Sequence, residues 1–504
     1  MKIKNSSRNI ALAFVLQLVS ILFGLILPRM LILTYGSETN GYISSVAQVL
    51  SYLSILEAGV AAASMQALYK PLFQNDRSEV NSILAAVHKN YQRTGLFYGI
   101  LVIALALLYP ASVTAGIGYV RMAIIVLISG LPSVANYMVQ GKYRIVLMAE
   151  GKNYVCSTAQ IVATVLSNSV KVLLIWRRAD IVLVQGTAVF SAVIQIVCFS
   201  YYIRKHYNWF DLKAVPDYQA ISQKNAVLVH NIAGLVFNNT DIILITYFCG
   251  LKDVSIYSIY NSLFGFLTTA VVSITDGLRF IFGEAYQKGR DYYILLLDSY
   301  EAFLTSFIFS LYFVAFKMIL PFIGLYTDGA DINYINIYLP ALFCAIKLID
   351  SGRSAALTTI YVAGTFQETK NKAIIECVIN LTVSIISMLY VGMIGVLFGT
   401  VAALAYRVTD TIIFTNHYIL KRKAWRSFSV WLQNILIFLL MLWAVHSFDF
   451  SADGYIEWAL KAAGLTITCL LVFVGSTCLI RRKAAVDLLT LISIELKRRK
   501  HQGF

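Results

Sequence analysis

Long runs of apolar residues, separated by short polar segments, follow one another along the whole chain. Each run holds about 20 to 28 residues, enough for a helix to cross roughly 30 Å of hydrocarbon. We therefore expect an all-α, multi-pass membrane protein. The pattern predicts about fourteen spans, near residues 10–34, 41–67, 94–117, 119–141, 155–175, 181–203, 226–248, 254–276, 292–317, 333–361, 372–391, 395–418, 428–447 and 456–480.

The overall composition supports this interpretation. Of the 504 residues, 59% are hydrophobic and 13% are charged, whereas soluble domains are about 45–50% apolar and 25% charged. The first apolar run is too long for the core of a signal peptide and no small-residue cleavage site follows it, which predicts a retained first helix. The seven cysteines lie in or beside apolar runs without a CxxC motif, so we expect core residues rather than disulfides or metal ligands.

The distribution of positive charge predicts the orientation. With the N-terminus inside, the inner segments hold about 30 of the 41 Lys and Arg residues and the outer loops hold about five. Both termini are therefore expected in the cytoplasm. The net charge of +15 reflects this topology and favours contact with anionic membrane lipids, so no nucleic-acid partner is needed to explain it.

An internal repeat divides the chain. The segment VLVQGT at residues 182–187 recurs as VLFGT at residues 396–400, and Gly151 matches Gly364 at nearly the same offset. The turn at Gly36 likewise matches the turn at Gly250. An even number of spans separates the copies, which predicts a parallel repeat. We expect two pseudo-symmetric six-helix lobes, residues 1–224 and 225–426, followed by two further helices and a basic tail in residues 427–504.

Charged residues interrupt several apolar runs. Arg29 follows Pro28 in the first predicted span, Glu57 lies in the second and Asp241 in the seventh. A charge at membrane depth costs several kcal/mol unless it is paired or faces a wet cavity, so each is a functional hypothesis. For Arg29, an alternative is that its side chain extends to the outer headgroups.

Two further sets of charges follow helical spacing. Lys347, Asp350 and Arg353 stand three residues apart in the tenth predicted span, and Arg407 and Asp410 do so in the twelfth. This spacing places each set near one helix face. Both sets could line a cavity or could pair with each other as struts between helices.

Other polar positions have simpler interpretations. His230 is expected to be a buried, hydrogen-bonded histidine, with proton carriage as the alternative. Four acids near helix ends are expected at the membrane interface or in pairs with nearby lysines such as Lys370 and Lys372: Asp298, Glu301, Glu368 and Glu376.

Motifs in both halves resemble a known family. They are Tyr35-Gly36 to Gly41-Tyr42, with residues 56–59, 67–72, 362–366, 374–376 and 392–400. These stretches are similar to the polysaccharide-biosynthesis or oligosaccharide-flippase family (Wzx-type), which belongs to the multidrug/oligosaccharidyl-lipid/polysaccharide exporter superfamily. The resemblance covers essentially the first twelve predicted spans and implies a MATE-like fold.

The resemblance also implies a function. Members of that family move undecaprenyl-diphosphate-linked oligosaccharide repeat units from the inner to the outer leaflet by alternating access, for capsule, O-antigen or exopolysaccharide synthesis. The implied location is the bacterial inner membrane, with polymerase and glycosyltransferases of the same pathway as partners. The implied protein is a transporter, not an enzyme.

Carrying a diphosphate across hydrocarbon requires cations. Arginine binds phosphate through two parallel hydrogen bonds, so arginines are better candidates than lysine. The predicted substrate-binding residues are Arg29, Lys347, Arg353 and Arg407. The predicted ion-coupling or charge-pairing residues are Glu57, Asp241, Asp350 and Asp410. Proton or Na⁺ coupling is a hypothesis for these acids, and no bound cofactor, metal or catalytic residue is expected.

Two other functions stay open. A cation-coupled multidrug or metabolite exporter of the same superfamily would favour a mainly acidic cavity, whereas the embedded bases here match or exceed the acids. A membrane glycosyltransferase or O-antigen polymerase would need a large outer loop, and the longest predicted outer loop, residues 321–334, is short. The chain also lacks a G-x-x-x-x-G-K-[ST] motif, which argues against ATP hydrolysis by the chain itself.

Overall fold

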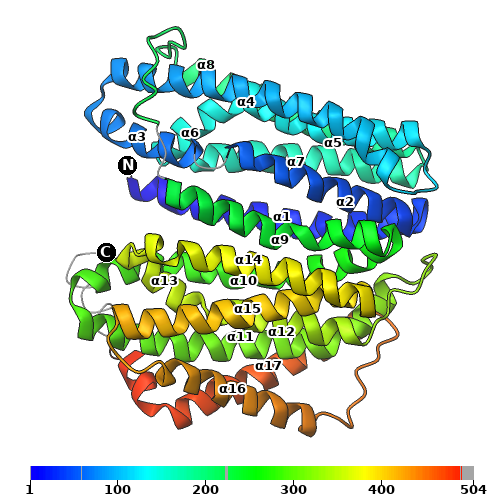
Figure 1. Cartoon of the computed structure of the whole chain (residues 1–504), viewed down its shortest axis with the longest axis vertical. Coiled ribbons are helices and arrows are strands. Elements are labelled where there is room, and N and C mark those ends of the chain that lie inside the picture. Colours follow the sequence, from blue (N-terminus) through cyan, green and yellow to red (C-terminus); the bar gives the residue numbers. More distant parts are fainter. Residues whose placement is uncertain (1, 58–59, 222–224, 489, 491–504) are drawn as a thin grey trace. The chain divides into compact units, whose positions relative to one another are not determined.

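A computed structural model describes the chain except for residues 1, 58–59, 222–224, 489 and 491–504. Every regular element within the described residues is helical (Figure 1). The helices form two compact units. The first comprises Met1–Ser258 with Gly329–Ile332, and the second comprises Ile259–Asp328 with Asn333–Phe504.

The first unit holds the helices up to the beginning of α10. These are α1 (Lys2–Tyr35), α2 (Ser37–Leu53), η1 (Ser54–Glu57), α3 (Val60–Gln74), α4 (Arg77–Ser112), α5 (Tyr119–Ala135), η2 (Asn136–Gln140), α6 (Gly141–Ala149), α7 (Asn153–Trp176), α8 (Ile181–His206) and α9 (Asn225–Phe248). Helices α5, η2 and α6 continue one another as a single span, with η2 a π-helical turn.

The second unit holds most of α10 (Leu251–Gln287) and all later helices. These are α11 (Arg290–Tyr326), α12 (Tyr338–Gly352), α13 (Ser354–Ala363), α14 (Phe366–Val391), α15 (Ile394–Phe414), η3 (Thr415–Ile419), α16 (Trp425–Ala444) and α17 (Tyr455–Ile480). Helices α16 and α17 both pack against α11 (Figure 1). Aromatic side chains fill that contact, with Phe309, Phe313 and Phe473 buried in one cluster.

Two glycines make the sharp turns between helices that the repeat predicted to be equivalent. Gly36 joins α1 to α2 with a φ of 84°, and Gly250 joins α9 to α10 with a φ of 100°. Residues other than glycine rarely adopt positive φ, which explains the choice of residue at both turns. The two turns thus share a positive φ at the position that the repeat predicted to be equivalent.

Eleven helices in the described part of the chain are long and apolar enough to cross a membrane. This confirms the prediction of a multi-pass, all-helical membrane protein. Three other predicted spans have a different form. The second and tenth predicted spans are divided between shorter helices. The seventh contains the apolar helical segment Ile232–Phe248, which is shorter than the eleven long helices. The total of about fourteen spans therefore stays a prediction.

The division by contacts lies at Ser258 rather than at residue 224, because α9 packs against α2 within the first unit. The predicted six-helix lobes and their boundaries remain a prediction. The two C-terminal helices predicted in residues 427–504 correspond to α16 and α17, which belong to the second unit.

Candidate functional site

Six charged side chains meet in the second unit, within helices that the sequence predicts to span the membrane. We call this group the ion cluster. It draws on α12, α14, α15 and the junction between α12 and α13. Its members are Asp350, Arg353, Lys372, Glu376, Arg407 and Asp410.

Glu376 is the centre of the ion cluster. The residue is 7% exposed, with Oε1 at 3.1 Å from Arg353 Nη1 and Oε2 at 3.3 Å from Arg407 Nε. Arg407 is itself only 4% exposed. Its Nε and Nη1 are buried without a hydrogen bond among the described residues. The guanidinium is therefore held by charge more than by hydrogen-bond geometry.

The remaining carboxylates complete the balance of charge. Arg353 Nη2 lies 2.7 Å from Asp350 Oδ1. Asp410 receives Lys372 Nζ at 2.6 Å and Arg407 Nη1 at 3.7 Å. Three cations thus face three carboxylates, which makes the ion cluster neutral in sum. Six charged side chains can be buried together only if their charges balance, because burying an uncompensated charge in a low-dielectric interior costs free energy.

Helix geometry brings these groups together. Helices α14 and α15 approach closely at Gly399, which has no side chain; a Cβ there would overlap Ser384 of α14. This contact lets Arg407 on α15 reach Glu376 on α14. Arg353 occupies the break between α12 and α13, with φ −79° and ψ −3°. The break directs a long side chain from the end of α12 towards α14.

A cavity of about 240 Å³ adjoins the ion cluster on the side of α10. Its lining includes Asp350 and Arg353 from the cluster, together with Asp276 and the hydroxyl-bearing Thr268 and Thr275 of α10. Polar groups therefore extend from the cluster into open space within the same unit.

An apolar groove lies between α12, α15 and α16. Two adjacent hollows of about 400 and 220 Å³ share Ile349 of α12 with Trp431 and Ile435 of α16. A side chain at Gly352 would overlap the indole of Trp431, so glycine at this position lets the ring pack directly on α12. Helices α12 and α15 thus combine charged side chains with an apolar groove.

The structure brings four of the eight predicted site residues into the ion cluster, namely Asp350, Arg353, Arg407 and Asp410. Lys347 lies one turn before Asp350 on α12 and is half-buried. Their roles in binding or coupling remain predictions. The alternative of paired struts between helices likewise remains a prediction.

The other three predicted residues belong to the first unit. Arg29 is half-buried on α1, after Pro28. Asp241 of α9 is 7% exposed and its Oδ2 accepts a hydrogen bond of 2.8 Å from the Tyr257 hydroxyl of α10. Glu57 ends η1, and its side chain lies outside the described ones, as does His230.

Asp241 lies beside a row of polar contacts between α2 and α9. Ser51 Oγ donates to Asn239 Oδ1 at 2.9 Å, and Ser45 Oγ shares a hydrogen bond of 2.6 Å with Thr246 Oγ1. Hydroxyl and amide groups, rather than apolar packing alone, therefore join these two helices.

Sequence reasoning missed two members of the ion cluster. Glu376 was expected at the interface or paired with the nearby Lys370 and Lys372. That expectation is wrong: Glu376 is buried between two arginines and Lys372 instead binds Asp410. The informative feature was the position of Glu376 inside the apolar run Ile-Ile-Glu-Cys-Val.

No family model and no curated protein matches the sequence, whereas solved structures match most of it. The lipid II flippase MurJ, in an inward closed conformation, aligns with a TM-score of 0.66 and 14% identity over 93% of this chain and 98% of that chain. An inward-facing multidrug resistance transporter of the MATE family and MOP superfamily aligns with a TM-score of 0.63 and 14% identity, over 80% of this chain and 95% of that chain.

A third match is a MOP-superfamily transporter from Pyrococcus furiosus, for which a binding pocket of reverse polarity is reported to suggest a different function. Its TM-score is 0.53 at 14% identity, over 83% of this chain and 97% of that chain. This chain is therefore a multi-pass helical membrane protein with the fold of MOP-superfamily transporters. Among the solved structures that share this fold are a lipid II flippase and multidrug transporters.

Proposed function

We propose that the protein is a flippase for undecaprenyl-diphosphate-linked oligosaccharide, acting by alternating access in the bacterial inner membrane. The observation that carries the proposal is the arrangement of α12 and α15. One side of these helices joins a buried ion cluster, and another side forms an apolar groove with α16. A substrate with an ionised head and a long hydrocarbon tail needs both environments.

The groove suits the hydrocarbon end of such a substrate. Its lining is aliphatic and aromatic, with Val408 and Ile412 from α15 facing Phe428 and Trp431 from α16. Apolar contact with a prenyl chain is favourable in proportion to the area removed from water. A hydrophilic metabolite would gain nothing from this surface.

The arginines suit the diphosphate end. In the ion cluster Arg353 and Arg407 share Glu376, so binding a phosphate there requires an exchange of partners. Guanidinium binds phosphate bidentately, and Arg407 has buried N–H groups that make no hydrogen bond among the described residues. We propose that the carboxylates hold the arginines between transport steps and release them when substrate arrives.

Release of the arginines offers a coupling mechanism. Protonation of a carboxylate, or binding of Na⁺ to it, removes its attraction for the paired arginine. Asp350 and Asp410 lie at the edges of the ion cluster, each paired with a cation. We propose that one of them takes up the coupling ion.

The test is complementation of a flippase-deleted bacterial strain whose glycan pathway is otherwise intact. Surface polysaccharide and the inner-leaflet lipid-linked intermediate are both measured. We expect Arg353→Gln and Arg407→Gln to accumulate the intermediate, with Lys423→Gln as the matched control because Lys423 is exposed and lies outside the cluster. Membrane levels of each variant are compared by immunoblot.

A second pair of variants tests the groove. Ala405 lines it, so Ala405→Trp is expected to block the tail and to lower export. Ala459→Trp adds the same bulk at an exposed position of α17 and should export normally. Normal export by all well-expressed cluster and groove variants would overturn the proposal.

The alternative is a cation-coupled multidrug or metabolite exporter, and the specific observation in its favour is the acidic character of the cavity beside α10, where Asp276 and Asp350 face one arginine. Wild-type protein that fails to restore polysaccharide but confers resistance to cationic drugs would support it.

A further inference from the structure

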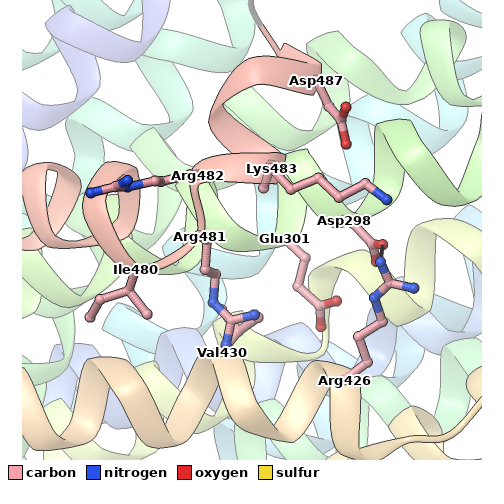
Figure 2. Close-up of a pocket in the computed structure, with 10 residues that line it drawn as sticks. Asp298, Glu301, Arg426, Val430, Ile480, Arg481, Arg482, Lys483 and Asp487 are labelled. Carbon is pink, nitrogen blue, oxygen red and sulfur yellow. Dashed lines mark ion pairs between the residues drawn. The ribbon is translucent and has the colours of Figure 1, made fainter.

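A separate cavity of about 370 Å³ lies in the second unit at the end of α17. We call it the α17 pocket. Figure 2 shows its lining, which comes from α11, α16, the last residue of α17 and the segment 481–487 that follows it. Its volume falls in the range of about 300–1,000 Å³ that is usual for small-molecule sites. It shares no residue with the ion cluster.

The acids of α11 in the α17 pocket are already paired with residues around the start of α16. Asp298 lies 2.8 Å from Arg426 Nη2 and also pairs with Arg422. Glu301 accepts a hydrogen bond of 2.9 Å from the Ser427 hydroxyl. The direct partners of these acids therefore lie around the start of α16, and both acids attract Arg481 from beyond ion-pair distance.

Three consecutive cations on the other wall have different surroundings. The Arg481 guanidinium donates to Gln433 Oε1 at 2.8 Å and to Ser429 Oγ at 2.9 Å. Both acceptors are neutral and orient the guanidinium, while Glu301 and Asp298 attract it without forming an ion pair. Arg482 and Lys483 are exposed. None of the three cations takes part in an ion pair recorded among the described residues.

The wall that carries these cations is fixed in place. The Ser299 hydroxyl of α11 donates to the backbone carbonyl of Ala484 at 3.1 Å. This bond anchors the segment 481–487 to α11, with Asp487 as its single acid. This wall of the pocket is therefore joined to α11 and carries three cations beside one acid.

We propose that the α17 pocket binds the phosphate of an anionic phospholipid headgroup, with phosphatidylglycerol as the simplest example. The site lies directly after Ile480, where the apolar helix α17 ends, and the headgroup region begins where a membrane-spanning helix leaves the hydrocarbon. Arginine and lysine beside a membrane surface attract anionic lipids. Ile480 and Val430 of the lining offer apolar contact to the first carbons of the acyl chains.

The experiment measures lipid retention by native mass spectrometry of full-length protein released from phosphatidylglycerol or phosphatidylcholine nanodiscs. Wild type should retain phosphatidylglycerol in preference to phosphatidylcholine. The triple variant Arg481→Gln/Arg482→Gln/Lys483→Gln should lose about threefold or more of that retention, because three cations near the headgroup are removed. Equal retention by wild type and triple variant would overturn the proposal.

A matched control removes the same charge elsewhere. Lys70, Lys89 and Arg93 are exposed in the first unit, and the triple change to Gln at these positions should leave retention unchanged. An equal loss in this control would mean that net charge alone attracts the lipid, which contradicts a built site.

Two further measurements make the result decisive. The variant Arg482→Glu/Lys483→Glu keeps the hydrogen bonds of Arg481 and so separates loss of the site from misfolding. It should also retain less phosphatidylglycerol than wild type. Retention equal to wild type would contradict the proposal. Millimolar inorganic phosphate should not displace the lipid, since the acyl contacts belong to the site. Complete displacement would identify a free-phosphate site instead.

Discussion

The substitution Glu376→Gln tests whether the ion cluster is a single electrostatic unit. Glutamine keeps the shape of the side chain and removes the charge that Arg353 and Arg407 share. At an effective dielectric constant of about 20, pairs at these distances have a gross Coulomb attraction of about 5 kcal/mol each. Much of that attraction offsets the cost of removing the charges from water.

The expected change is therefore smaller than the gross attraction. Removing one partner of a buried ion pair costs about 3–5 kcal/mol, because the other charge stays buried without compensation. Arg353 keeps Asp350 at 2.7 Å and Arg407 keeps Asp410 at 3.7 Å. We therefore expect Glu376→Gln to lower the free energy of unfolding by about 3 kcal/mol, near the lower end of that range.

The assay is unfolding in mixed micelles titrated with a denaturing detergent, which reports the free energy of unfolding of helical membrane proteins. Glu368→Gln is the matched control, since Glu368 is exposed in the first turn of the same helix, and it should be neutral. Glu376→Gln and Arg407→Met should be coupled by about 2 kcal/mol in a double-mutant cycle. Additive effects, or wild-type stability of Glu376→Gln, would refute the reasoning.

Three further outcomes are expected. Gln185→Leu should lower the free energy of unfolding by about 2 kcal/mol. The reason is that Lys171 Nζ donates to Gln185 Oε1 at 2.9 Å and would lose this acceptor. Wild-type stability of the variant would contradict this reasoning. Adding Lys171→Met should restore most of the loss, since no donor is then left unsatisfied. Gly352→Ala should shift the emission of Trp431, which it would displace, whereas Gly186→Ala, with open space around it, should leave the spectrum unchanged.

Much of the fold could be predicted from the sequence because a membrane imposes one strong constraint. A chain in hydrocarbon must satisfy its own backbone hydrogen bonds, so long apolar runs become helices. The runs near α4, α8 and α11 behave in this way. The tenth predicted span does not form one continuous helix, and it is divided at Arg353 between α12 and α13.

The candidate site was predictable only where it is local. The three-residue spacing of Asp350 and Arg353, and of Arg407 and Asp410, indicated shared helix faces, and both pairs are present. Glu376 was misassigned because it was paired with lysines that are its neighbours in the sequence. Its actual partners come from α15 and from the end of α12, more than twenty residues away in either direction.

By itself, the sequence determined that this protein is a helical membrane protein and which of its charges lie inside apolar runs. Both follow from properties of single segments, namely length, hydropathy and spacing. Only the tertiary structure decided that six charges form one neutral cluster, and that Arg481 is held by neutral side chains while the acids beside it are paired. The physical reason is that spacing along a helix fixes which side chains share a face, whereas the packing of other helices decides what that face meets.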